Sequence, residues 1–218
     1  MDKNTSECLD KISNDACREI EALPQMQAML SGKINSDQYV KFLFKLYPIV
    51  LNFCPVMAIA AGNSLGSQYD HLKKYFFDHL IEELGHEQLV LSDINSFDVA
   101  IDNEILDRFP SPPIQAMLAF NQGLAISNPY GVLGMIYVLE MMACFYGGRV
   151  ADAVSKVMCR QLANGFTFLS SHAELDMDHF EKTKKYINSI ENKKYRQSIL
   201  NAVKMNFYFF KNIISSED

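Results

Sequence analysis

Apolar residues recur at helical spacing along nearly the whole chain. In the stretch INSDQYVKFLFKLYPIV, which begins at residue 34, they follow one another at intervals of three and four residues, the period of an amphipathic α-helix. The alternation typical of β-strands joined by hairpin turns does not occur. The sequence therefore predicts an all-α fold of seven to eight helices around one core, forming a single domain over residues 1–218.

Breaks in this pattern set the expected limits of the helices. Helices are expected at about 5–22, 36–61, 69–94, 114–125, 128–154, 166–190 and 194–215. Ser36 is the expected N-cap of the second helix. The third is expected to continue through Gly85, and the fifth to bend at Gly147-Gly148.

Composition and charge exclude several classes of protein. The net charge of −6 is opposite to that of a nucleic-acid-binding surface, so no nucleic-acid partner is expected. The five cysteines are odd in number, widely spaced and without a CxxC motif, which favours a reducing compartment over a disulfide framework or a thiolate zinc site. The N-terminus is polar, and the longest apolar run, 48–61, is too short to span a bilayer. A cytoplasmic protein without membrane contact is therefore expected.

Acidic residues and histidines suited to metal binding gather in three places. The first is EELGH, where Glu83 and His86 are three residues apart on an expected helix. Glu82 and His79 are alternative ligands on the same helix, because His79, Glu83 and His86 share one stripe. Glu83 and His86 are preferred as the ligand pair.

The second place is Glu140, a lone carboxylate in the otherwise apolar stretch MIYVLEMMACF. Burial of a carboxylate costs several kcal/mol unless it is paired or bound to a metal. An ion pair with Arg149 or Lys156 is the alternative to metal binding. Tyr137 lies three residues earlier, so it is a candidate catalytic residue as a hydrogen-bond donor or a redox-active phenol, although simple packing explains it equally well.

The third place lies in the sixth expected helix. His172, Asp176 and His179 are separated by four and three residues and so line one stripe of a helix. A solvated face is the alternative, but Phe168 and Phe180 are among the apolar residues that flank the stripe. The three places together offer three carboxylates and three imidazoles, a mixed donor set that suits iron or manganese with positions left open for dioxygen.

The order ExxH, then a lone Glu, then HxxxDxxH resembles the heme-oxygenase-like diiron oxidases and oxygenases. The resemblance extends from residue 34 to residue 180 and implies a heme-oxygenase-like helical bundle, as in the wider group with TenA-type thiaminases and the PqqC-type oxidase. It implies two iron ions, or a manganese–iron pair. By resemblance, one ion is bound by Glu83, His86 and His172 and the other by Glu140, Asp176 and His179, with bridging carboxylates.

The resemblance implies an enzyme that uses O2 to oxidise or oxygenate a small apolar or amphipathic substrate. An external reductant and a homodimer are compatible with this reading. Heme degradation is not expected, because heme oxygenases need a proximal histidine in their first helix and the first histidine here is His71. Three alternatives stay open: a metal-free TenA-like hydrolase using Cys144, a ferritin-like diiron protein, and an interaction protein on the same fold.

Overall fold

The computed structural model describes residues 5–98 and 110–216, except for the side chains of residues 172–176. Throughout this part of the chain the regular structure is helical, which confirms the all-α fold. The helices are α1 (Thr5–Glu21), α2 (Pro24–Leu30), α3 (Ser36–Asn63), η1 (Ser67–Tyr69), α4 (Asp70–Glu83), α5 (His86–Asn95), α7 (Pro112–Ser127), η2 (Pro129–Gly131), α8 (Val132–Met142), η3 (Ala143–Gly147), α9 (Gly148–Val157), α10 (Thr167–Ser189) and α11 (Lys193–Ser215).

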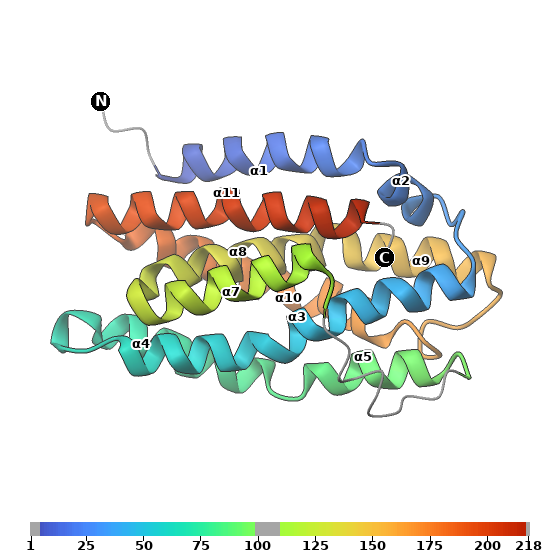
Figure 1. Ribbon diagram of the computed structural model, residues 1–218, viewed down its shortest axis with the longest axis horizontal. Coiled ribbons are helices and arrows are strands. Elements are labelled where there is room, and N and C mark those ends of the chain that lie inside the picture. Colours follow the sequence, from blue (N-terminus) through green and yellow to red (C-terminus); the bar gives the residue numbers. More distant parts are fainter. Residues whose placement is uncertain (1–4, 99–109, 217–218) are drawn as a thin grey trace.

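The long helices run side by side along the molecule (Figure 1). Helices α1 and α11 lie along one side and α3, α4 and α5 along the other, with α8 and α10 between them (Figure 1). Ten of the eleven residues of α8 are buried, so this helix forms the centre of the bundle. Its Glu140 is therefore held deep in the protein and surrounded by neighbouring helices.

The expected helix over 69–94 is divided into α4 and α5. Gly85 separates them with a φ of 91°, and Leu84 before it is extended with a ψ of 125°. The expectation that the helix continues through Gly85 was wrong, because this left-handed backbone ends the helical hydrogen-bond pattern. The break leaves Glu83 as the last residue of α4 and His86 as the first of α5.

The expected bend at Gly147-Gly148 coincides with a change of helix type. A π-helical segment, η3, joins α8 to α9 and ends at Gly147. A β-carbon at Gly147 would lie 2.9 Å from the backbone oxygen of Leu169, so glycine allows α10 to pack directly against this segment. Single π-helical turns within α-helices are frequent at functional sites.

The N-terminus of α3 is capped by Asn35, one residue before the expected Ser36. The Asn35 side chain accepts a hydrogen bond of 2.9 Å from the Gln38 backbone, and the Gln38 side chain accepts one of 2.9 Å from the Asn35 backbone. This reciprocal pair is a capping box, which satisfies two backbone donors at the start of the helix. Ser36 is the first residue of the helix itself.

Within the described residues, two helical stretches are long and apolar enough, by length and composition alone, to cross a membrane. They are Ser36–Asn63 and Pro129–Val157. The most apolar window of the second is 72% buried and that of the first 33%. Both stretches contribute buried residues to the same apolar core, and core helices commonly have such compositions.

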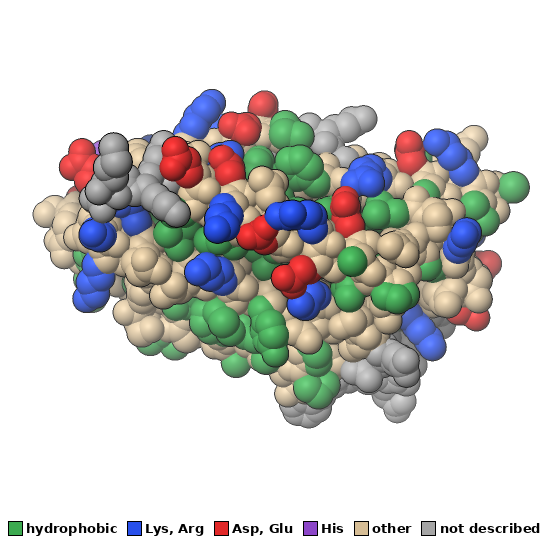
Figure 2. Space-filling view, turned by 90° about the horizontal axis from the view of Figure 1, so that it is seen from above, with side chains coloured by type: hydrophobic (Ala, Val, Ile, Leu, Met, Phe, Trp, Pro, Cys, Tyr) green, Lys and Arg blue, Asp and Glu red, His purple; other side chains and the backbone are tan. Residues whose placement is uncertain are grey.

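The face that α1 and α11 form carries both signs of charge. Figure 2, which views this face, shows basic and acidic side chains interspersed. Lys211 of α11 pairs with Glu19 of α1 at 2.7 Å, and Lys184 of α10 pairs with Asp10 of α1 at 2.6 Å. Such a mixed pattern creates no extended field of one sign on this face.

We expect Gly85→Ala to lower the free energy of unfolding by about 1–2 kcal/mol, because an L-residue pays this much to adopt a left-handed conformation. A β-carbon at Gly85 would meet no atom within 4 Å, so the backbone alone accounts for the cost. The matched control is Gly123→Ala in α7, which also meets no atom within 4 Å and has no positive φ. Urea unfolding should show the control unchanged or stabilised by up to about 1 kcal/mol; equal effects at both sites would contradict the assignment.

Candidate functional site

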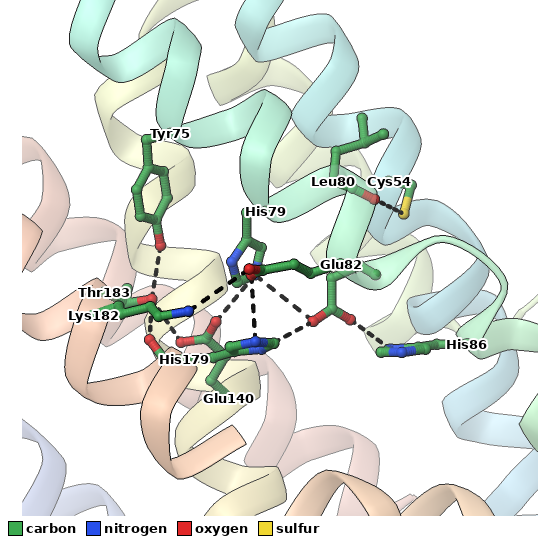
Figure 3. Close-up of polar contacts among 11 residues, drawn as sticks. Cys54, Tyr75, His79, Leu80, Glu82, His86, Glu140, His179, Lys182 and Thr183 are labelled. Atoms are coloured by element: carbon green, nitrogen blue, oxygen red, sulfur yellow. Dashed lines mark hydrogen bonds and ion pairs between the residues drawn. The ribbon is translucent and has the colours of Figure 1, made fainter. Parts of the chain in front are cut away.

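The buried carboxylate of Glu140 lies at the centre of a cluster formed by α4, α5, α8 and α10 (Figure 3). Glu140 is only 4% exposed. Its Oε1 lies 3.0 Å from Nε2 of His79, and its Oε2 accepts a hydrogen bond of 2.7 Å from Oγ1 of Thr183. These polar groups compensate part of the cost of burying the carboxylate.

Glu83 faces the same space from the end of α4. Its Oε2 lies 2.8 Å from Nδ1 of His86, and its Oε1 lies 3.7 Å from Nδ1 of His179 and 3.9 Å from Nε2 of His79. Burial by itself would raise the pKa of Glu83, but the interactions with His179 and His86 outweigh it and hold the pKa well below its usual value. The interaction with Glu83 in turn raises the pKa of His179.

Glu82 occupies the rim of the cluster. It is 40% exposed, and its two oxygens lie 3.3 Å from Nε2 of His179 and 3.7 Å from Nζ of Lys182. Glu83, by contrast, is 8% exposed. This difference in exposure favours Glu83 over Glu82 as the inner carboxylate. His79, the alternative histidine ligand, also contacts Glu83, as His86 does.

The ion pair considered as the alternative role of Glu140 is not formed. Arg149 lies 3.3 Å from Glu21, and Lys156 lies 3.6 Å from Asp152. Both basic residues thus pair with acidic residues of their own at the surface. The partners of Glu140 are instead a histidine and a threonine, neither of which carries a fixed positive charge.

Two members of the cluster were missed in the sequence. Thr183 is fully buried and donates to Glu140, while the hydroxyl of Tyr75 lies 2.7 Å from Thr183 Oγ1. Thr183 lies four residues after His179, and Tyr75 lies four residues before His79. That spacing places each on the helical stripe of its histidine and was the signal that could have identified both.

The hydroxyl of Tyr137 points to a different part of the bundle. It lies 2.9 Å from Oγ of Ser13 in α1 and is buried. Burial, partly offset by the bond with Ser13, raises the pKa of Tyr137 to about 12. A catalytic role for Tyr137 stays a prediction, whereas Tyr75 is the tyrosine that the hydrogen bonds connect to the cluster through Thr183.

Four of the six expected metal ligands, Glu83, His86, Glu140 and His179, lie in this cluster. The side chains of the other two, His172 and Asp176, lie outside the described residues, although α10 is continuous from Thr167 to Ser189 as their spacing requires. Among the side chains that the structure describes, no group of three or more His, Cys, Asp or Glu is placed to hold a metal ion. The described part of the cluster is therefore only part of the expected donor set.

An apolar cavity of about 110 Å³ adjoins the cluster. Apolar side chains of α2, α3, α8, η3, α9, α10 and α11 line it, including Met29, Phe53 and Phe168. Glu83 and Glu140 are the charged residues among those described in its wall. Cys144, the candidate nucleophile of a metal-free hydrolase, does not line it. A small apolar molecule in this cavity would lie beside two carboxylates.

Solved structures of low sequence identity share the fold. A domain of unknown function with a heme oxygenase-like fold from Shewanella denitrificans has a TM-score of 0.82 at 20% identity, over 98% of this chain and 91% of that one. Heme oxygenase from Leptospira interrogans has a TM-score of 0.79 at 16% identity, over 98% and 99%. A TenA homolog from Pseudomonas syringae pv. tomato has a TM-score of 0.76 at 14% identity, over 94% and 89%. At such identities, the likeness shows the heme oxygenase-like fold and no more.

A comparison with curated proteins finds no match. A family model described as iron-containing redox enzyme, however, matches residues 40–207 of the sequence. The match covers more than half of the chain and includes every residue of the cluster described above. The protein therefore belongs to this heme oxygenase-like family of iron-containing redox enzymes.

Proposed function

We propose that the protein is a non-heme, dinuclear-iron oxidase or oxygenase that uses O2 to modify a small apolar or amphipathic molecule. The observation that supports this proposal most directly is the pair of buried carboxylates, Glu83 and Glu140, which face imidazoles at the wall of an apolar cavity. Membership of a family of iron-containing redox enzymes supports the same chemistry.

The donor chemistry of the cluster fits iron. Carboxylate oxygens and imidazole nitrogens are the ligands of non-heme iron sites. Glu140 Oε1 and His79 Nε2 are both buried, and neither makes a well-aligned hydrogen bond within the described part of the protein. Glu140 Oε1 is therefore available to a cation, and a cation would offset the cost of burying two carboxylates close together.

The proposed ligands are Glu83, His86, Glu140 and His179 from the described cluster, together with His172 and Asp176 of α10. Bound iron would supply the chemistry that couples the reduction of O2 to the oxidation of the substrate. The apolar wall of the cavity binds the substrate and excludes water from the reacting groups. Thr183 orients the Glu140 carboxylate through its hydrogen bond to Oε2, and Tyr75 in turn holds the Thr183 hydroxyl.

Other activities of this fold have less support. The cavity of about 110 Å³ is far too small for a heme. No histidine occurs before His71, so the first helix cannot supply a proximal heme ligand. A hydrolase dependent on Cys144 is disfavoured because that residue does not line the cavity.

Anaerobic loading with Fe(II) should give about two irons per chain, and the loaded protein should consume O2. Glu140→Gln keeps the shape of the side chain but removes its charge, so it should lower the iron content to about one per chain or less. Metal analysis after removal of loose iron, and an oxygen electrode, measure the two outcomes.

The matched control is Glu181→Gln, which removes an exposed carboxylate on α10, only two residues after His179. It should retain the iron content and O2 uptake of the unaltered protein. Wild-type protein that binds no iron tightly, or a Glu140→Gln variant that retains both irons, would contradict the proposal.

Thr183→Val should weaken iron binding by about tenfold or more, as is typical when a hydrogen bond to a metal ligand is lost. It should also lower the free energy of unfolding by about 1–3 kcal/mol, because Glu140 Oε2 and the Tyr75 hydroxyl lose a buried partner. Thr183→Ser retains the hydroxyl and should restore most of the iron affinity. Competition with a chelator measures the affinity, and a valine variant that binds iron as tightly as the serine variant would rule out this role for Thr183.

A further inference from the structure

A second, larger pocket adjoins the apolar cavity at one end of the bundle. This outer pocket has a volume of about 470 Å³ and lies between α2, the start of α3 and the end of α11, which meet there (Figure 1). Met29, Phe42 and Ile214 line both the outer pocket and the cavity. The two spaces therefore meet at these three side chains and together lead from the protein surface to Glu83 and Glu140.

This path is polar at its outer end and mainly apolar within. Lys41 and Lys45 line the outer pocket, and the described part of its wall contains no acidic residue. We propose that the path binds a single-chain anionic amphiphile, with its head group at the two lysines and the far end of its apolar chain beside Glu83 and Glu140. The inference rests on the proposed function, because it names the class of substrate that the site would oxidise.

One stripe of α3 follows the whole path. Gln38, Lys41 and Lys45 line the outer pocket. Ile49 and Phe53, further along the same helix, line the cavity. Steps of three and four residues place all five side chains on one side of the helix. This side of α3 thus changes from polar to apolar where the path enters the core, as the surface of an amphiphile does along its length.

The length of this stripe sets the length of the chain. Lys45 and Lys41 precede Phe53 by eight and twelve residues, which is about 12 and 18 Å along the helix at about 1.5 Å per residue. Phe53 contacts the carboxylate cluster, since its ring centroid lies 5.9 Å from that of His79. An extended alkyl chain advances about 1.3 Å per carbon, because its bonds are about 1.5 Å long and zigzag. A chain of roughly nine to fourteen carbons therefore reaches from the lysines to the cluster.

The charges along the path favour one orientation of the amphiphile. Lys45 is half-buried and donates hydrogen bonds of 2.6 and 2.9 Å to the backbone oxygen and the hydroxyl of Ser216, which hold its charge in the wall of the outer pocket. Lys41 lies one turn earlier and is exposed, so its flexible side chain can turn toward an anion. The carboxylates of Glu83 and Glu140, at the inner end, have the same sign of charge as the head group.

The first test is calorimetric titration of the iron-loaded protein, without O2, with decyl phosphate, decanol and ethyl phosphate. Decyl phosphate should bind as one molecule per chain, at least about tenfold more tightly than either of the others, because decanol lacks the charge and ethyl phosphate lacks most of the chain. Lys41→Met keeps an apolar stem but removes the charge. It should weaken the binding of decyl phosphate about fivefold and leave the binding of decanol unchanged.

The matched control is Lys33→Met, which removes an exposed lysine just before α3 that does not line the outer pocket. It should leave the binding of decyl phosphate unchanged. Equal losses in the Lys41 and Lys33 variants, or a Lys41→Met protein that loses as much affinity for decanol as for decyl phosphate, would contradict a head-group site at Lys41.

The second test locates the far end of the chain. Crystals of the iron-loaded protein are grown without O2 and with decyl phosphate that carries bromine on its terminal carbon, because bromine scatters X-rays anomalously. The bromine should lie in the cavity near Phe53, with the phosphate near Lys41 and Lys45. A phosphate beside Glu83 and Glu140, or a chain bound outside the cavity, would overturn the inference.

The two proposals fail in different ways. The reverse orientation in a protein that binds iron and consumes O2 would overturn the inference and leave the proposed function intact. A protein that neither binds iron nor consumes O2 would overturn the proposed function, and with it the assignment of a bound amphiphile as the substrate.

Discussion

The structure depends on how it accommodates one buried charge, the carboxylate of Glu140. This residue lies in the most deeply buried helix of the bundle and is 4% exposed. An isolated carboxylate in such a place would be strongly destabilising, so groups from other helices must compensate it. His79 of α4 and Thr183 of α10 do so directly, which makes the packing of α4 and α10 against α8 a requirement of the site as well as of the core.

The same constraint explains the chemical contrast within the cavity. Apolar side chains from six α-helices and from η3 form most of its wall, and the charged groups described in it are Glu83 and Glu140. A low-dielectric wall strengthens every electrostatic interaction nearby. A cation bound between the carboxylates would therefore be attracted more strongly here than at the protein surface. A substrate in the cavity would be held in a dry environment.

The sequence was sufficient for the fold class and for much of the cluster because both depend on helical spacing. Glu140, the lone carboxylate of an apolar helix, lies at the centre of the cluster, and Glu83, His86 and His179 lie around it as their spacing led us to expect. Their role as metal ligands stays a prediction. The helix break at Gly85 could not be predicted because glycine is also tolerated within helices, and only the fold determines that its φ is positive.

For Thr183 and Tyr75 the spacing in the sequence indicated the helical stripe that each shares with a histidine, but not its hydrogen-bond partner. Threonine and tyrosine occur in most helices, and their role arises from a contact between α4 and α10, which are far apart in the chain. Tyr137 shows the converse: its position one turn before Glu140 suggested the site, whereas the packing of α1 provides Ser13 as the partner of its hydroxyl. Spacing along one helix therefore predicts which residues share a face, but the neighbouring helix decides their partners.

Anomalous X-ray diffraction at the iron absorption edge tests most directly whether the buried carboxylates and histidines bind iron. Crystals of protein loaded anaerobically with Fe(II) should show two strong anomalous peaks within the cluster, in contact with Glu83, His86, Glu140 and His179. Absence of iron peaks from this cluster, or peaks at surface residues only, would contradict the account.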